Sequence, residues 1–244
     1  MDFANKVVIV TGASSGIGAA SAILFAKHGA KLSLVGRNEQ RLKSVANKCY
    51  EANGCVPLAL QIDLTLQGSC ETVINKTVAK FEKIDVLVNC AAKFLIGTLF
   101  DDNINAFDEM ININLRVPYQ LTRLAVPYLV KTKGNIINFN ENYTRIKAGY
   151  LPYSVSKAAL ERFSKSSAME LASEGVRVNS IQPGILKKNR NTNLEVRQED
   201  RNDTYNTSNL EPEEVAKMVL FVASGLCPNI NGANLTINAV STYT

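Results

Sequence analysis

The stretch Thr11-Gly-Ala-Ser-Ser-Gly-Ile-Gly18 decides the fold of this chain. It follows the apolar run Val7–Val10 and leads into the helix-like stretch Ala19–Lys27, so the sequence predicts a strand, a glycine-rich turn and a helix in succession. The first two glycines permit backbone geometry and a close approach that a Cβ would block, and the third lets the helix pack near the strand. Free N–H groups at the start of such a helix face an anion, which predicts a phosphate-binding turn.

The composition is that of one globular domain. The chain of 244 residues is 46% hydrophobic and 20% charged, which suits a single sizeable core. Its Met-Asp-Phe-Ala start shows no basic-then-apolar leader, and no apolar run approaches the roughly 20 residues that span a bilayer. We therefore expect a cytoplasmic protein with no membrane partner.

Residue counts argue against several other kinds of site. The five cysteines include no Cys-x-x-Cys pair, which disfavours both a disulfide framework and a zinc site. The single histidine, His28, falls at the predicted C-terminal end of the first helix, so we expect no metal site and no Ser-His-Asp hydrolase. The net charge of +5 comes from basic residues interspersed with acids, so we expect no nucleic-acid partner.

Short β-rich runs alternate with longer amphipathic ones along the chain. The expected strands are Lys6–Val10, Lys31–Val35, Val56–Ile62, Val86–Asn89, Asn135–Phe139 and Arg177–Ile181. Such alternation predicts an α/β fold, a doubly wound parallel sheet with helices on both faces. Ligands of these sheets lie beyond the carboxyl ends of the strands. The polar segment 187–209 breaks the pattern, and we expect it to form an exposed lid.

The turn after the second strand indicates which cofactor the chain binds. It carries Gly36-Arg37-Asn38, where a site for NAD usually places an acidic residue on the ribose hydroxyls. Arg37 offers a planar guanidinium for a 2′-phosphate and a face for adenine, which favours NADP(H) over NAD(H). In the alternative, Arg37 is solvated surface and Glu39 takes the ribose.

Tyr153 and Lys157 are a candidate catalytic pair. They lie four residues apart, about one helical turn, so both side chains project from one helix face. A phenol is a poor acid or base at neutral pH, but a nearby ammonium and an oxidised nicotinamide ring favour the phenolate and lower its pKa. The pair therefore predicts proton transfer coupled to hydride transfer. The alternative is an exposed helix face, and the position of the pair after the fifth strand disfavours it.

The chain resembles the classical short-chain dehydrogenase/reductase family over nearly its entire length. Five motifs carry the resemblance: Thr-Gly-x-x-x-Gly-Ile-Gly at 11–18, Asp63-Leu64, Ile113-Asn-Leu115, Tyr153-x-x-x-Lys157 and Pro183-Gly184. The resemblance implies one Rossmann-type domain over residues 1–244, a nicotinamide cofactor, a small-molecule substrate and a homodimer or homotetramer. In the assembly it implies, helices near 105–129 and 153–173 pack against copies of themselves.

The resemblance also implies roles for single residues. Tyr153 is the acid/base, Lys157 holds the nicotinamide ribose and lowers the tyrosine pKa, and Asn114 has a structural and proton-relay role. Asp63 contacts adenine. The cofactor-binding residues that it implies, together with Arg37 from the argument above, are Gly12, Ser14, Ser15, Gly16, Ile17, Gly18, Arg37, Asp63, Leu64, Asn89, Ala91, Tyr153, Lys157, Pro183, Gly184 and Ile185.

The fifth strand departs from the family pattern. The family's Gly-x-Ile-Val-Asn-x-Ser-Ser corresponds to Gly134-Asn-Ile-Ile-Asn-Phe-Asn140-Glu141, so Glu141 stands at the position of the catalytic serine. An ionised carboxylate cannot donate a hydrogen bond to a substrate carbonyl, and it opposes the effect of Lys157 on Tyr153. Asn140 offers an amide donor instead, and Tyr143 and Thr144 are further alternatives.

Two functions follow from these residues. The first is an NADP(H)-dependent oxidoreductase acting on a small apolar alcohol or carbonyl, and the second is a catalytically weakened family member that binds the cofactor as a sensor or scaffold. Apolar residues near the strand ends favour an apolar substrate pocket, with core or subunit contacts as the alternative. They are Phe94, Leu95, Ile96, Leu99, Tyr150 and Leu151.

Overall fold

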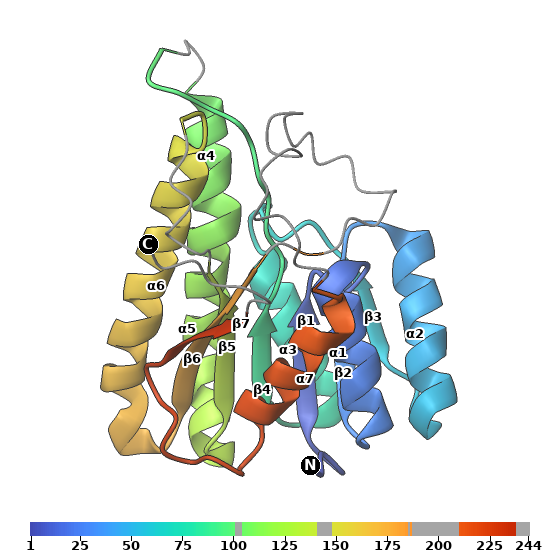
Figure 1. Ribbon diagram of the computed structural model, residues 1–244. Helices are drawn as coiled ribbons and strands as arrows, with labels where there is room; N and C mark the ends of the chain where they lie inside the picture. The colour runs from blue at the N-terminus through green and yellow to red at the C-terminus, as the bar shows by residue number, and fades with distance from the viewer. Residues whose placement is uncertain (101–103, 141–147, 185, 187–209, 238–244) are drawn as a thin grey trace.

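One parallel sheet organises the molecule. The computed structural model describes residues 1–100, 104–140, 148–184, 186 and 210–237, which form a seven-stranded sheet in the order β3-β2-β1-β4-β5-β6-β7 (Figure 1). The strands are β1 (Val7–Thr11), β2 (Lys31–Gly36), β3 (Leu58–Gln61), β4 (Val86–Asn89), β5 (Asn135–Phe139), β6 (Arg177–Pro183) and β7 (Asn234–Ile237). The strand order reverses between β1 and β4, and sheets of this kind bind ligands at that point, beyond the carboxyl ends. The predicted α/β fold is confirmed.

Helices cover both faces of the sheet (Figure 1). They are α1 (Gly16–Lys27), α2 (Glu39–Asn53), α3 (Ser69–Phe81), α4 (Asn105–Ile111), α5 (Val117–Thr132), α6 (Leu151–Leu171) and α7 (Pro212–Ala223). Side chains of α1, α2 and α7 share one hydrophobic core, and those of α3, α5 and α6 share the other. The sheet is therefore doubly wound, as predicted.

Alternate residues of each central strand supply these two cores. In β1, Val8 and Val10 belong to the core that contains Phe25 of α1, whereas Ile9 belongs to the core that contains Leu121 of α5. Every residue of β1 is buried. A strand covered on both faces needs a continuous apolar run, which is why the sequence predicts this strand so directly.

Five strands differ from the sequence prediction, and the bounds of β1, β2 and β6 do so by only one or two residues. β3 is shorter than the expected 56–62, because Val56 is exposed and Pro57 has no N–H to donate, so pairing with β2 begins at Leu58. The edge strand β7 was missed altogether. It has four residues, it is only partly buried, and it pairs with one neighbour, β6, so it carries no long apolar run.

The long helix expected near 105–129 is interrupted. α4 ends at Ile111, residues Asn112–Arg116 form a π-helical turn, and α5 begins at Val117. A π turn fits an extra residue into the helix and often occurs at functional sites. This one carries Asn114, which is buried. The second long helix, expected at 153–173, is α6 followed by a short 3₁₀ turn at Ala172–Glu174.

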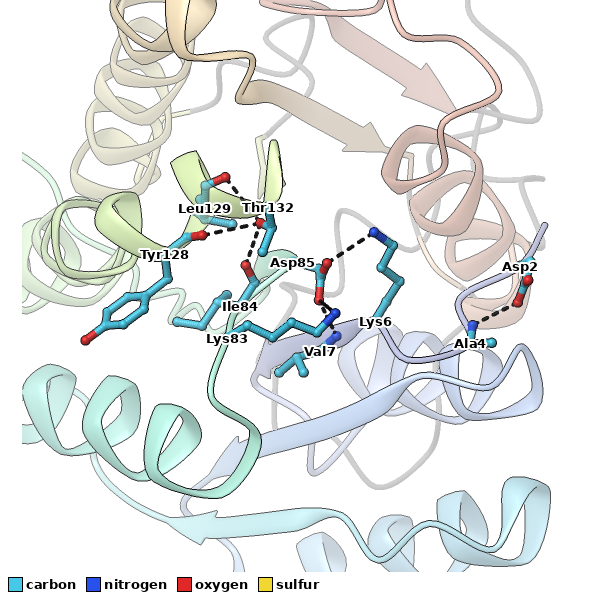
Figure 2. Close-up of polar contacts among 10 residues, drawn as sticks. All are labelled: Asp2, Ala4, Lys6, Val7, Lys83, Ile84, Asp85, Tyr128, Leu129 and Thr132. Carbon is cyan, nitrogen blue, oxygen red and sulfur yellow. Dashed lines mark hydrogen bonds and ion pairs between the residues drawn. The ribbon is translucent and has the colours of Figure 1, made fainter.

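At the amino ends of the strands, a buried carboxylate joins β1 to the segment that precedes β4 (Figure 2). Asp85 accepts a hydrogen bond from the backbone N–H of Val7 at 2.8 Å, and it pairs with the ammonium groups of Lys6 at 3.2 Å and Lys83 at 3.1 Å. A cavity of about 630 Å³ lies beside this cluster. Its lining residues come from the strand starts and the helix ends, so it lies at the edge of the sheet opposite the glycine turn.

The described part of the chain contains no helix that is both long and apolar enough to span a bilayer. The same residues offer no cluster of three His, Cys, Asp or Glu side chains that could hold a metal ion. His28 lies at the C-terminal end of α1, as expected, with its Nδ1 atom 2.7 Å from the carbonyl oxygen of Met1.

Candidate active site

The turn between β1 and α1 needs glycine at two positions because a Cβ there would clash with neighbouring backbone. Gly12 has φ +66°, and a Cβ there would lie 3.0 Å from the backbone nitrogen of Ala91. A Cβ on Gly18 would lie 2.3 Å from the carbonyl oxygen of Gly12. Gly16 has φ +53°, and no atom lies within 4 Å of the place where its Cβ would stand. The turn is thus closely packed at Gly12 and Gly18 and open at Gly16, which is the shape of a phosphate-binding turn.

The start of α1 suits an anion. Ser15, its N-cap, makes no side-chain capping bond within the described structure, and the first turn carries no acidic residue. Ser15 and Gly16 are exposed, whereas Ser14 is half-buried beside Gly36 at the end of β2. Backbone N–H groups at a helix start attract negative charge, so this end of α1 fits a pyrophosphate.

Arg37 and Asp63 lie on the side of β2 and β3. Arg37 is exposed and follows β2 directly. The Asp63 carboxylate accepts hydrogen bonds from the hydroxyl of Thr65 at 2.7 Å and its N–H at 3.0 Å. The Thr65 hydroxyl chiefly lowers the pKa of Asp63, and the charge of Arg37 adds to the effect. Glu39 pairs instead with Lys43 at 2.7 Å along the exposed face of α2.

Thr11 holds the end of β4 against the glycine turn. Its hydroxyl accepts hydrogen bonds from the N–H groups of Cys90 at 2.9 Å and Ala91 at 3.0 Å, and it donates to the Val88 carbonyl at 3.2 Å. The sequence prediction missed this role, although Thr11 opens the quoted motif. Burial raises the pKa of the Cys90 thiol to about 12, so that thiol is neutral.

Lys157 is buried at the carboxyl end of β5. Lys157 is only 3% exposed, and its ammonium donates a hydrogen bond to the Phe139 carbonyl at 2.8 Å. The ammonium nitrogen lies 5.8 Å from the centre of the Tyr153 ring. The alternative of an exposed lysine on a helix face is therefore wrong. A buried positive charge beside a phenol favours negative charge on its oxygen.

Phe94 forms an aromatic contact with the candidate acid/base. Its ring meets the Tyr153 ring edge-to-face at 5.0 Å between centres, and it meets the Tyr150 ring in the same way at 4.8 Å. The loop that carries Phe94 follows β4, so the structure brings these predicted apolar residues to the strand ends. Leu99, by contrast, is 85% exposed.

Asn114 organises the loop after β4. Its amide oxygen accepts a hydrogen bond from the Lys93 N–H, and its amide nitrogen donates to the Lys93 carbonyl, both at 3.0 Å. The same nitrogen lies 3.0 Å from the hydroxyl of Ser156, which in turn donates to the Tyr153 carbonyl at 2.7 Å. Asn114 thus joins the π turn, the loop and α6. Ser156, between the two motif residues of α6, was missed from the sequence.

A second amide network lies between β4, β5 and α6. The Asn89 amide donates to the Asn138 amide oxygen at 2.9 Å, and Asn138 donates to the Ser164 hydroxyl at 2.8 Å. Asn138, which the sequence prediction also missed, therefore fixes Asn89. Asn140, the residue that follows the end of β5, is 4% exposed, and neither polar atom of its side chain has a hydrogen-bond partner in the structure.

The remaining predicted residues fall into two groups. Leu64 is buried, and Pro183 and Gly184 lie at the end of β6, where the Gly184 N–H donates to the Ile237 carbonyl at 2.8 Å. The others lie outside the described residues, together with the expected lid at 187–209. They are Glu141, Tyr143, Thr144 and Ile185.

Known proteins resemble this chain over most of its length. A family model described as enoyl-(acyl carrier protein) reductase matches residues 12–239. The chain is 31% identical over 245 residues to a 3-oxoacyl-[acyl-carrier-protein] reductase of Thermotoga maritima, with 98% of each chain covered. It is 29% identical over 246 residues to the meso-2,3-butanediol dehydrogenase of Serratia marcescens, covering 99% of this chain and 96% of that one. A crystal structure from Caenorhabditis elegans, a short-chain dehydrogenase/reductase of unknown function with cofactor, has a TM-score of 0.85 at 31% identity, covering 96% of this chain and 94% of the other.

Proposed function

Because this chain belongs to the classical short-chain dehydrogenase/reductase family, we propose that it is an NADP(H)-dependent oxidoreductase acting on a small apolar alcohol or carbonyl compound. The observation that carries the proposal is the buried Lys157 ammonium, held on the Phe139 carbonyl beside the Tyr153 ring. Relatives named as a 3-oxoacyl reductase and a butanediol dehydrogenase support the interconversion of a carbonyl and an alcohol. The cytoplasmic location, the homo-oligomer and the single domain over 1–244 stay predictions.

The glycine turn supports a dinucleotide cofactor, because a Cβ at Gly12 or Gly18 would clash with the backbone that shapes the turn, whereas the space at Gly16 is open. In this proposal the N–H groups at the start of α1 hold the pyrophosphate, and Arg37 pairs with a 2′-phosphate. Asp63 lies on the adenine side, and Pro183 and Gly184 lie on the nicotinamide side. When bound, the nicotinamide supplies or accepts the hydride.

The chain's own residues supply the proton. In the reductive direction a hydride adds to the carbonyl carbon, the carbonyl π electrons move to the oxygen, and that oxygen takes the proton of the Tyr153 phenol. Lys157 stabilises the phenolate that remains. Phe94 and Tyr150 place apolar surface beside the phenol, which favours a small apolar substrate.

The test is turnover of NADPH with a panel of ketones, aldehydes and quinones, followed by cofactor absorbance. Tyr153→Phe should abolish turnover and leave NADPH affinity nearly intact, because the phenol acts in the transition state. Tyr128→Phe, on α5, is the matched control and should keep full activity. A Tyr153→Phe protein as fast as the parent would refute the assignment.

The second candidate, a cofactor-binding sensor or scaffold, rests on Glu141 at the serine position. That residue lies outside the described part of the structure. NADPH binding without turnover of any carbonyl in the panel would favour this function over the enzyme.

A further inference from the structure

Asn140 continues β5 into the candidate site. Its backbone N–H donates to the Ile181 carbonyl of β6 at 2.9 Å, so the residue extends the pairing of the two strands by one position. The preceding carbonyl, of Phe139, is the one that accepts the Lys157 ammonium. Asn140 therefore lies at the carboxyl edge of the sheet, beside the group that carries the proposed function.

The Asn140 side chain faces the layer that contains α6. Side chains alternate along a strand, so Asn140 shares a face with Ile136 and Asn138. Ile136 belongs to the core of α3, α5 and α6, and Asn138 donates to Ser164 of α6. The helix runs from its start near the carboxyl edge, so its Tyr153 and Lys157 lie further toward that edge than Ser164 (Figure 1).

The carboxamide of Asn140 is buried and unpaired at both ends. The residue is 4% exposed, and neither its amide nitrogen nor its oxygen has a hydrogen-bond partner. Across the described residues, no other side chain has two buried polar atoms without partners. By contrast, the buried side chains of Asn114 and Asn138 use their amides fully or nearly so. A buried amide without a hydrogen-bond partner destabilises a fold. An unpaired amide at the edge of the sheet where ligands bind therefore indicates that a ligand supplies the missing partners.

We propose that Asn140 binds the substrate through both ends of its carboxamide, and that the substrate carries oxygen atoms on adjacent carbons, as in an α-hydroxyketone or a vicinal diol. The amide N–H donates to the oxygen of the reacting carbonyl, and the amide oxygen accepts the neighbouring hydroxyl. Two oxygens on adjacent carbons match the spacing of the nitrogen and oxygen of one carboxamide. A simple ketone leaves the amide oxygen unpaired, and this loss disfavours it.

This inference rests on the proposed oxidoreductase function, and it narrows the small substrate to one that carries a second oxygen on the carbon next to the reacting carbon. In the reductive direction, the ketone carbon of the α-hydroxyketone gains the hydride of the reduced nicotinamide. The carbonyl oxygen then takes the π electrons and the Tyr153 proton, which yields a vicinal diol, a phenolate and the oxidised cofactor. The neighbouring hydroxyl keeps its proton and its bond to Asn140 throughout.

The test compares three ketones at saturating NADPH: 3-hydroxy-2-butanone, its isomer 4-hydroxy-2-butanone, and 2-butanone. We expect kcat/KM for 3-hydroxy-2-butanone to exceed both others by about 10- to 100-fold, the effect of one unmade hydrogen bond to a buried group. Asn140→Leu, close in size and unable to pair, should lower that ratio to about one while leaving the Tm equal to or above that of the parent. A merely structural asparagine would instead lower the Tm and all three rates together.

Asn135→Leu is the matched control, since Asn135 is a buried asparagine at the other end of β5 whose amide oxygen also lacks a partner. It should leave the substrate ratio unchanged. Binding gives a second readout without turnover: calorimetry on the protein with NADPH should show 2,3-butanediol binding about 10-fold or more tightly than 2-butanol.

Equal kcat/KM values for the three ketones in the parent protein, or an unchanged ratio in Asn140→Leu, would overturn the inference and leave the oxidoreductase function standing. No turnover of these ketones or of any other carbonyl would overturn both.

Discussion

At the scale of single residues, Arg37 carries the expected preference for NADPH. Arg37→Ala should weaken NADPH binding by about 1–3 kcal/mol, because it removes charge-assisted hydrogen bonds to the 2′-phosphate, and it should change NADH binding little. Titration by cofactor fluorescence measures both affinities. Arg162→Ala, which removes an exposed arginine from α6, is the control. If the parent binds NADPH and NADH equally well, the prediction is wrong.

A substitution at Gly18 tests whether the glycine turn binds the cofactor. In Gly18→Ala the new Cβ would stand 2.3 Å from the Gly12 carbonyl oxygen, so the turn or the start of α1 must move. We expect the free energy of unfolding to fall by about 1–3 kcal/mol and NADPH binding to weaken. Gly54→Ala, at φ +73° with open space around it, should cost about 1–2 kcal/mol and spare cofactor binding. Unchanged NADPH affinity in Gly18→Ala would contradict the proposed role of the glycine turn.

At the scale of elements, Asp85 joins β1 to the segment before β4 (Figure 2). Asp85→Ala leaves the Val7 N–H without its partner and should lower the free energy of unfolding by about 1–3 kcal/mol, measured by urea denaturation. The two lysines are partly exposed and can turn to solvent, which limits the loss. NADPH affinity should not change, because the cluster lies at the opposite edge of the sheet. Glu39→Ala, which breaks a pair on the exposed face of α2, should leave the free energy of unfolding nearly unchanged.

The sequence predicts elements well where local pattern decides them. β1 and β4 are buried throughout and read as continuous or nearly continuous apolar runs, so their positions follow from the local sequence pattern. The edge strand β7 and the π turn at Asn112–Arg116 escape prediction. The first depends on pairing with a distant strand, and the second shares its residue preferences with an α-helix.

The same distinction holds within the candidate site. The glycine turn and the Tyr153–Lys157 pair are local motifs, and the sequence names them directly. Thr11 bonds partners 77 to 80 residues away, and Ser156 bonds Asn114, which is 42 residues away, so only the fold shows these contacts. The unpaired amide of Asn140 depends on burial by several elements at once, which no local pattern encodes.

At the scale of the whole molecule, buried thiols make stability depend on pH. Burial raises the pKa of Cys49 from 9.0 to about 12 and that of Cys70 from 9.0 to about 11. Well below pH 9 both the folded and the unfolded chain keep these protons, so the contribution of the thiols to stability is constant. Above pH 9 the unfolded chain releases protons that the folded chain retains, so the free energy of unfolding falls, by about 1 kcal/mol per thiol at pH 10.

Urea denaturation at pH 8 and pH 10 measures this loss. Cys49→Ala should lose about 1 kcal/mol less than the parent between the two pH values, whereas Cys55→Ala, which removes an exposed thiol, should lose as much as the parent. An identical loss in Cys49→Ala and the parent would contradict the assignment.

The surface of helices α4, α5 and α6 indicates that the protein assembles into an oligomer. They and the residue before α4 expose large apolar side chains that include Ile104, Tyr119, Val155 and Met169. Tyr119 of α5 also contacts Phe163 of α6, with 5.4 Å between ring centres, so the two helices form one continuous face. Exposed apolar surface of this kind favours burial against a second copy about a two-fold axis.

We therefore expect light scattering at micromolar concentration to report at least twice the mass of one chain. Tyr119→Glu places a charge in the middle of this face and should yield a monomer, because an unpaired carboxylate is costly to bury. Tyr50→Glu is a close control, since Tyr50 on α2 is 51% exposed and Tyr119 is 52% exposed, but α2 lies on the other face of the sheet. A monomeric parent protein would refute the expected oligomer. A Tyr119→Glu variant that remains a dimer would show that the interface lies on another face of the molecule.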